Sequence, residues 1–295
     1  MKKLFLFVVV NLALLASAYS FTRSNFDSPE SFVTDTETGA YYVSNVNGSP
    51  AAKDGNGYIS KISANGNLVI QKFIGGKDSD PVLNAPKGLL VLRKQIWVTD
   101  IDAVKVFNKE TAKPVKIIDA TAFGAKFLND IAADSDGKVY VSDMLGDQIL
   151  KIDPAKDYKV TVFKRGKELG NPNGLIFNPK SRSLMAVAFR SGQILEIDRR
   201  GKIHILKKGL SALDGIDYDN EGNLYTSSFD KGEIYKIPFY GRGALTIFQN
   251  NLTTPSDISC DRKRNDILIP SYRGNTVTTV FLFEKARQKD FSKNS

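Results

Sequence analysis

Six polar residues recur along the sequence, each immediately before a short apolar stretch, and their types suit the binding of a cation. They are Glu30, Lys87, Asn129, Asn173, Asp214 and Ser256, and are called the anchor residues below. Two carboxylates and two amides among them offer oxygen ligands with little total negative charge, a set that suits Ca²⁺ or Mg²⁺ completed by water. Zn²⁺ prefers His and Cys ligands and fits this set poorly. The anchor residues therefore predict a divalent-cation site, with Ca²⁺ favoured and Mg²⁺ or Mn²⁺ as alternatives.

The anchor residues mark an internal repeat. In one copy, Pro172-Asn173-Gly174-Leu175 is followed by a polar turn and then by two further apolar segments, 183–188 and 193–197. The copies recur about every 42 residues, except after the first, a period typical of propellers and arrays. The extra residues after the first copy fall at 47–57, which is rich in Gly, Asn and Ser. This segment is either a lid over the site or a surface insertion without a role.

The repeat predicts an all-β fold, a six-bladed β-propeller with four short antiparallel strands in each blade. We expect the second strands of the blades at 40–46, 95–101, 138–144, 183–188, 223–229 and 266–272. The last copy contains three clear strands, so residues near Phe21 to Phe26 are expected to supply its outer strand and close the ring. Because the first strand of a blade is innermost, the anchor residues should converge on one mouth of the central channel.

The N-terminus has the pattern of a secretory leader. Lys2 and Lys3 precede an apolar run, Leu4 to Leu15, and the small residues of Ala16-Ser17-Ala18 fit a signal-peptidase site. A retained membrane-spanning helix is the alternative, but Asn11 interrupts the run, which is shorter than the roughly 20 residues that a span needs. We therefore predict a signal peptide at 1–18, a propeller at 19–283 and a polar tail at 284–295, in a periplasmic or secreted protein without stable membrane insertion.

Charge and composition exclude several classes of protein. The net charge of +9 comes from basic residues scattered along the chain, which indicates a solvated surface and argues against a nucleic-acid partner. With His204 as its one histidine, the chain has no HExxH motif and no histidine dyad. It also lacks the G-x-S-x-G elbow of serine hydrolases and the phosphate-binding loop of nucleotide hydrolases.

Through the anchor residues and the short segments around them, the chain resembles the SMP-30/gluconolactonase/LRE-like family of six-bladed hydrolases, which includes calcium-dependent lactonases. The resemblance covers essentially the whole mature chain. Four segments carry it: Pro29-Glu30, Leu128-Asn129-Asp130, Pro172-Asn173-Gly174-Leu175 and Leu213-Asp214-Gly215-Ile216 with the following Asp219 and Gly222-Asn223-Leu224-Tyr225.

The resemblance implies a role for each matching residue. Glu30, Asn173 and Asp214 would be metal ligands, and Asp214 would also be the catalytic general base. Asn129 would be a further ligand or a substrate contact. Lys87 is assigned to substrate binding, in place of the arginine that many sugar lactonases place over the substrate.

The predicted function is metal-assisted hydrolysis of a small-molecule substrate, a sugar lactone or another small cyclic ester. A cation acting as Lewis acid would polarise the lactone carbonyl, and a carboxylate would accept the proton of the attacking water. The alternative is a non-catalytic propeller of the NHL type that binds a protein, peptide or glycan, because propellers host both kinds of function.

Overall fold

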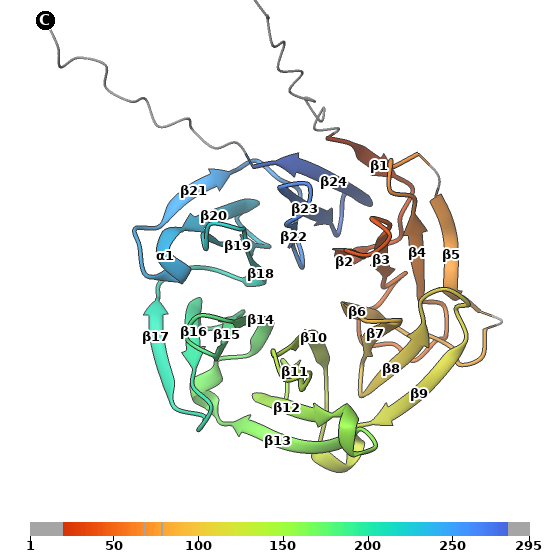
Figure 1. Ribbon diagram of the computed structural model, residues 1–295, viewed down its shortest axis with the longest axis horizontal. Coiled ribbons are helices and arrows are strands. Elements are labelled where there is room, and N and C mark those ends of the chain that lie inside the picture. The colour runs from red at the N-terminus through yellow and green to blue at the C-terminus, as the bar shows by residue number, and fades with distance from the viewer. Residues whose placement is uncertain (1–19, 68, 78, 283–295) are drawn as a thin grey trace, which may run out of the picture.

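The computed structural model describes residues 20–67, 69–77 and 79–282, so the predicted signal peptide at 1–18 and tail at 284–295 lie outside the described residues. The described chain forms six four-stranded antiparallel sheets arranged around a central axis (Figure 1), which confirms the predicted six-bladed β-propeller. Within these residues, no helix is long and apolar enough to cross a membrane.

The first three blades are built from consecutive strands. Blade 1 contains β2 (Pro29–Thr34), β3 (Tyr41–Asn45), β4 (Tyr58–Ile62) and β5 (Val69–Gly75). Blade 2 contains β6 (Pro86–Leu92), β7 (Gln95–Asp100), β8 (Ala103–Asn108) and β9 (Pro114–Asp119). Blade 3 contains β10 (Leu128–Ala133), β11 (Val139–Asp143), β12 (Gln148–Asp153) and β13 (Lys159–Arg165).

Blades 4 and 5 repeat the pattern, and blade 6 combines both ends of the chain. Blade 4 contains β14 (Pro172–Asn178), β15 (Ser183–Ala188), β16 (Gln193–Ile197) and β17 (Ile203–Lys207). Blade 5 contains β18 (Leu213–Tyr218), β19 (Leu224–Ser228), β20 (Glu233–Ile237) and β21 (Thr246–Gln249). Blade 6 contains β22 (Ser259–Asp261), β23 (Asp266–Ser271), β24 (Thr276–Phe281) and β1 (Thr22–Ser24). Short helices lie between strands: η1 (Thr121–Phe123), η2 (Pro154–Lys156), η3 (Lys167–Leu169) and α1 (Pro238–Gly241).

The ring closes as the sequence predicts. Strand β1 pairs antiparallel with β24, with Arg23 opposite Val277. The inner strands of blades 6 and 1 are also joined, because the Asp257 amide donates to the Glu30 carbonyl at 2.9 Å. N-terminal and C-terminal strands therefore pair within blade 6, and a backbone hydrogen bond joins blade 6 to blade 1.

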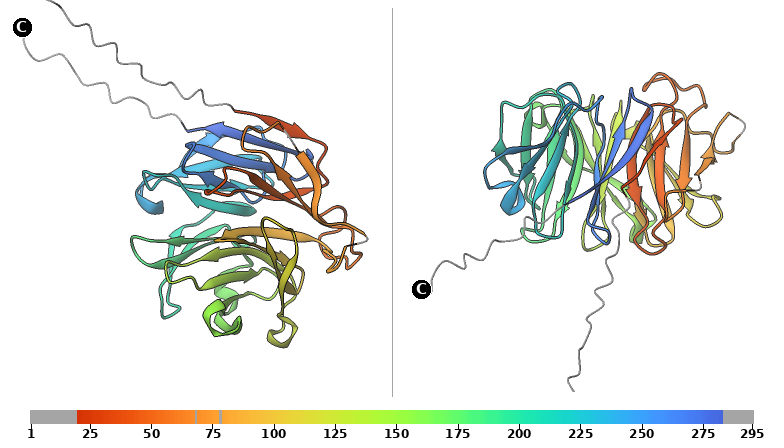
Figure 2. Two further views of the ribbon diagram at one scale, coloured as in Figure 1. Left: turned by 45° about the vertical axis from the view of Figure 1, so that its right-hand side comes forward. Right: turned by 90° about the horizontal axis from the view of Figure 1, so that it is seen from above.

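The core lies between the blades. Each of six hydrophobic clusters combines side chains of two neighbouring blades; for example, Tyr42 and Ile59 of blade 1 pack with Ile96 and Val98 of blade 2. The first strand of each blade lies nearest the axis in Figure 1, and Figure 2 shows the strands running between the two faces of the disc. Since every blade has the same strand order, all inner strands begin at one face, where the anchor residues lie.

Candidate functional site

An irregularity in the inner strands sets the anchor residues apart from ordinary strand residues. In blade 1, Pro29 pairs with Asn45 but Phe32 pairs with Val43, so three steps along β2 oppose two steps along β3. The same shift occurs at the anchor in blades 2, 3, 4 and 5. A one-residue bulge of this kind bends the strand and redirects a side chain. The anchor residue and its successor thereby leave the regular ladder at the axis.

Hydroxyl groups of the second strands support these bulges. Each accepts a hydrogen bond from the amide that follows an anchor residue: Ser44 Oγ from Ser31 N (2.9 Å), Ser142 Oγ from Asp130 N (2.8 Å) and Ser227 Oγ from Gly215 N (2.8 Å). The bulged amides lack a partner in the regular ladder and are buried, so these bonds avoid the cost of leaving them unsatisfied.

Glycines after the anchors allow the inner strands to approach one another. A Cβ atom at Gly174 would lie 2.3 Å from the Asp214 carbonyl oxygen, and one at Gly215 would lie 2.2 Å from the Ile258 amide nitrogen. Real Cβ atoms do not approach so closely, so a larger residue at either position would push the strands apart. Contacts between neighbouring inner strands continue around the whole ring.

All five predicted site residues lie in this buried ring. The exposed fractions are 6% for Glu30, 1% for Lys87, 3% for Asn129, 2% for Asn173 and 3% for Asp214. Ser256, the sixth anchor, is fully buried, and its hydroxyl donates to the Pro29 carbonyl at 3.0 Å, so it joins blades 6 and 1.

Three oxygen atoms of the ring lack a protein partner. Asn129 Oδ1, Asn173 Oδ1 and Asp214 Oδ1 are buried and accept no hydrogen bond from the described residues. Buried polar atoms are nearly always satisfied, and an exception of this kind calls for an explanation such as an ion. The three atoms come from blades 3, 4 and 5, which are neighbours, and all are hard oxygen donors of the type that Ca²⁺ and Mg²⁺ bind.

The carboxylates of the ring influence one another. The pKa of Glu30 is raised to about 8, first by burial and then by the charge of Asp257, while the charge of Lys87 opposes the shift. Burial likewise raises the pKa of Asp214 well above its usual value, and Glu30 is the first of the negative charges that add to the shift. Negative charge is therefore costly in this ring without a compensating cation.

Lys87 supplies one positive charge within the ring. Its Nζ donates to the Ala85 carbonyl at 2.9 Å and lies 4.2 Å from the centroid of the Phe127 ring. Burial lowers the pKa of Lys87 to about 8, and Glu30 and Asp100 oppose that shift. The ammonium group is thus held by a carbonyl and an aromatic face, and it interacts electrostatically with Glu30.

The donor set fits a hard cation better than a transition metal. Within the described chain, no group of three or more His, Cys, Asp or Glu side chains is arranged to hold a metal ion. The predicted set differs from such groups because two of its members, Asn129 and Asn173, are amides. The three unpartnered oxygens and the nearby carboxylate of Glu30 match oxygen coordination completed by water.

Two further carboxylates and two aromatic residues near the ring were not predicted as site residues. Asp130 and Asp257 each follow an anchor and are buried, and burial raises the pKa of both, to about 7 for Asp257. Phe127 faces Lys87, and Tyr272 interacts with the charges of Glu30 and Asp214. Each of the four lies at a fixed distance from the anchor residue or from the end of the second strand in its copy of the repeat, so the repeat could have identified them.

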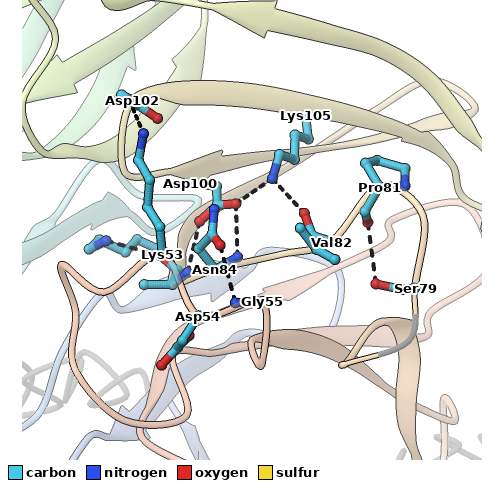
Figure 3. Close-up of polar contacts among 12 residues, drawn as sticks. Lys53, Asp54, Gly55, Ser79, Pro81, Val82, Asn84, Asp100, Asp102 and Lys105 are labelled. Carbon is cyan, nitrogen blue, oxygen red and sulfur yellow. Dashed lines mark hydrogen bonds and ion pairs between the residues drawn. The ribbon is translucent and has the colours of Figure 1, made fainter.

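Side chains at the ends of second strands hold the loops on the anchor face. Asp100 accepts hydrogen bonds from Asn84 N (3.0 Å) and Lys105 Nζ (2.6 Å), as shown in Figure 3. It also accepts one from Ala85 N (2.8 Å). Asp143 occupies the same place in blade 3 and accepts from Phe127 N at 2.8 Å. These carboxylates fix the segments that lead into β6 and β10, and with them Lys87 and Asn129.

The insertion at 47–57 packs against blade 2. Gly57 N donates to the Leu83 carbonyl (2.9 Å), Gly55 N donates to Asn84 Oδ1 (3.2 Å) and Lys53 forms an ion pair with Asp102 (2.5 Å), the last two of which Figure 3 also draws. The segment therefore forms part of the wall on the anchor face.

A cavity of about 240 Å³ lies at the opposite end of the axis. Its lining comes from the later residues of the inner strands and includes Asp130, Asp257 and the ion pair of Asp217 with Arg262. Two cavities of about 440 Å³ lie elsewhere, and neither is lined by an anchor residue. The axis thus has a polar anchor layer at one end and a more apolar cavity at the other.

Comparisons with solved structures identify the same fold. A catalytically inactive histidine-to-alanine variant of virginiamycin B lyase from Staphylococcus aureus, solved with quinupristin, matches with a TM-score of 0.61 and 14% identity over 90% of this chain and 99% of that chain. A streptogramin B lyase structure matches with a TM-score of 0.60 and 16% identity over 90% and 87% of the two chains.

A third structure has no assigned function. It is a protein of unknown function from Bacteroides thetaiotaomicron VPI-5482, with a TM-score of 0.67 and 14% identity over 86% of this chain and 69% of that chain. No protein-family model and no curated protein matches the sequence. At these identities the similarity establishes the propeller fold, and membership of the SMP-30/gluconolactonase/LRE-like family stays a prediction.

Proposed function

We propose that this protein is a metal-dependent hydrolase that opens a lactone at the anchor ring. The observation that carries the proposal is the set of three buried, unpartnered oxygens of Asn129, Asn173 and Asp214 on neighbouring blades. Glu30 supports it, because its carboxylate is close enough to raise the pKa of Asp214. Under the proposal these four residues hold a divalent cation, Ca²⁺ in the first instance.

The similar lyases do not suggest a shared catalytic group. A histidine-to-alanine change is present in the inactive virginiamycin B lyase, whereas the one histidine of this chain, His204, is exposed on the outer strand β17. Catalysis by this protein therefore has to use other side chains, and the anchor ring supplies carboxylates.

Bound there, a divalent cation would act as a Lewis acid on the lactone carbonyl. Asp214 is assigned the role of general base through its second carboxylate oxygen, Oδ2, while its unpartnered Oδ1 is left to hold the cation. A bound cation would favour the ionised form of Asp214, which is the form that can accept a proton. Water adds to the carbonyl carbon, the ring C–O bond breaks, and the proton passes to the released oxygen, giving a hydroxy acid.

Lys87 would bind the substrate. A protonated lysine has three N–H groups, and one of them is used by the Ala85 carbonyl. The remaining two can donate to a substrate oxygen. This is the role that an arginine has in many sugar lactonases and that is assigned here to Lys87.

The test is calorimetric titration of Ca²⁺ into the chain from Tyr19 onward, followed by a lactone-hydrolysis screen on the same samples. Asp214→Ala should abolish binding and turnover. Asp230→Ala is the matched control, because Asp230 is an exposed carboxylate in the same blade, and it should leave both unchanged. A well-folded wild type that binds none of Ca²⁺, Mg²⁺ and Mn²⁺ would overturn the proposal and favour a binding scaffold.

Export is a separate part of the proposal and rests on the leader pattern at 1–18 alone. Expression with the native N-terminus in a bacterial host should give a periplasmic or secreted protein that begins near Tyr19. N-terminal sequencing of that fraction would check it, and a full-length protein retained in the cytosol would contradict it.

A further inference from the structure

A second column of the repeat lies directly above the anchor ring. It consists of the residue that follows the last residue of each second strand, and all six members are apolar or aromatic: Val46, Ile101, Met144, Phe189, Phe229 and Tyr272. Four of them, Met144, Phe189, Phe229 and Tyr272, begin turns, where polar residues would be the usual choice. We call all six the collar residues.

Direct contacts connect the collar to the ring. Met144 Sδ lies 3.8 Å from Asn129 Nδ2. The pKa of Tyr272 is raised to about 12, first by burial and then by the negative charges of Glu30 and Asp214. The collar therefore borders the oxygens that are proposed to hold the cation.

The aromatic members form a continuous wall. Phe189 and Phe229 have ring centroids 6.4 Å apart, and Phe229 meets Tyr272 edge-on at 5.7 Å. Tyr272 in turn packs against Val46 and Ile101, which are buried. Met144, Phe189, Phe229 and Tyr272 are half-buried, and the Arg273 guanidinium lies over the Phe229 ring, 5.6 Å from its centroid. The exposed parts of the four side chains are available to a ligand.

Two amide side chains beside the collar each use one of their two N–H donors within the protein. Asn171 Nδ2 donates to the Met144 carbonyl at 2.7 Å, and Asn47 Nδ2 donates to the Asn56 carbonyl at 2.9 Å. A sugar lactone carries several hydroxyl groups, and burying them without partners is costly. An alkyl or aryl substituent has no such groups and gains from contact with an apolar wall.

We propose that the substrate of this site is a hydrophobic lactone, with its ester over the anchor ring and an alkyl or aryl substituent against Met144, Phe189, Phe229 and Tyr272. The position of the ester rests on the proposed function. The preference for an apolar ligand rests on the collar itself.

Binding can be measured without turnover. The probes are two lactams, cyclic amides that replace the hydrolysable ester: a γ-lactam with an octyl substituent and a sugar δ-lactam with free hydroxyls. By calorimetric titration in 1 mM CaCl₂, a routine assay concentration, the octyl lactam should bind about 100-fold more tightly, the effect of burying three to four methylene groups at about 0.8 kcal/mol each. Tighter binding of the sugar lactam would overturn the proposal.

Variants of the wall test the position of the substituent. Phe229→Ala and Phe189→Ala should each weaken the octyl lactam about tenfold while leaving an unsubstituted γ-lactam unaffected, and Phe229→Leu should restore most of the loss. Phe239→Ala removes a phenylalanine that is 75% exposed in α1, away from the ring, and is the control. Unchanged octyl-lactam binding in both alanine variants would contradict the proposal, with circular dichroism confirming that each variant is folded.

The two proposals fail in different ways. Octyl-lactam binding that depends on Phe229 but not on Ca²⁺, in a protein that hydrolyses no lactone, would remove the proposed hydrolase and leave an apolar ligand site. Ca²⁺ binding and lactone turnover with a preference for the sugar lactam would keep the hydrolase and remove the hydrophobic substrate.

Discussion

The ammonium group of Lys87 lies over the face of Phe127, 4.2 Å from the ring centroid, in the same buried ring as Glu30 and Asp214. An aromatic face and one carbonyl stabilise a lysine that is almost fully removed from water. The positive charge lies in the same buried ring in which the proposal places a divalent cation. Lys87 should therefore both compete with the metal and guide the substrate.

Replacing this lysine should strengthen metal binding. Lys87→Met removes a positive charge from the ring, so Ca²⁺ affinity should rise by at least about tenfold, given effective interactions of a few kcal/mol between charges several ångströms apart. Turnover should fall, because the substrate loses a donor. Lys126→Met, at an exposed lysine next to Phe127, should change neither quantity in calorimetry or in the hydrolysis assay. Equal Ca²⁺ affinity in Lys87→Met and wild type would show that the ammonium group does not act on the metal.

The metal-free protein should lose stability as the pH rises from about 4.5 to 8. The pKa of Glu30 is raised from 4.5 to about 8 and that of Asp257 from 3.8 to about 7, so both acids hold their protons longer in the folded chain than in the unfolded one. Their contribution to stability is complete below the unfolded values and is lost as the pH passes the folded values. The loss should amount to several kcal/mol, seen as a fall in Tm by calorimetry in EDTA.

Calcium should reverse that trend, because it binds the ionised carboxylates. Added Ca²⁺ should raise Tm strongly at pH 8 and little at pH 5, and binding at pH 7 should release protons into the buffer. Asp257→Asn is the comparison variant and should flatten the metal-free profile. A metal-free Tm that increases steadily up to pH 8 would contradict the charge arrangement described for the ring.

The close approach of the inner strands should make Gly174 intolerant of a side chain. In Gly174→Ala the new Cβ would meet the Asp214 carbonyl at 2.3 Å, so β14 and β18 must separate. We expect a loss of about 2 kcal/mol or more in the free energy of unfolding, and Ca²⁺ affinity reduced at least tenfold. Gly124→Ala is the control, since nothing lies within 4 Å of the added atom; it should cost only the left-handed backbone penalty of about 1 kcal/mol. Equal effects of the two changes in denaturant unfolding would argue against tight packing at the axis.

Strand β1 should be necessary for a stable ring. A chain that begins at Asn25 lacks Thr22–Ser24 and leaves the edge of β24 unpaired, and it also loses the packing of Phe21 against Tyr41 at 5.5 Å. Its Tm should fall by several degrees and it should aggregate more readily, because exposed strand edges pair with other chains. The chain that begins at Tyr19 retains β1 and is the reference. Identical melting of the two chains would mean that blade 6 is complete without β1.

Much of the fold was predictable because the repeat constrains it. The predicted second strands agree with the observed ones within one residue, and the strand near Phe21 to Phe26 closes blade 6 as expected. The positions of the anchor residues in one buried ring also followed from the repeat. Spacing alone, however, cannot show that the charges of Glu30 and Lys87 interact. Nor can it show that the Ser256 hydroxyl donates a hydrogen bond to the Pro29 carbonyl.

Other parts of the site depend on contacts between strands that are distant in sequence. The bulge amides that bond to Ser44, Ser142 and Ser227 could not be recognised without the register, although Ser44-Asn45 and Ser142-Asp143 recur at the same place. The collar was missed for another reason. Apolar residues such as Phe229 at a strand end were interpreted as the continuation of a buried strand, whereas they begin the turn beyond it.

The bulges in the inner strands of blades 1 to 5 have a consequence for how such a protein can change. In blades 1, 3 and 5, a serine hydroxyl from the second strand of the same blade accepts a hydrogen bond from the bulged amide. The side chain of the anchor residue is not part of that support. New chemistry can therefore be acquired by exchanging one anchor side chain at a time on a backbone that other residues hold.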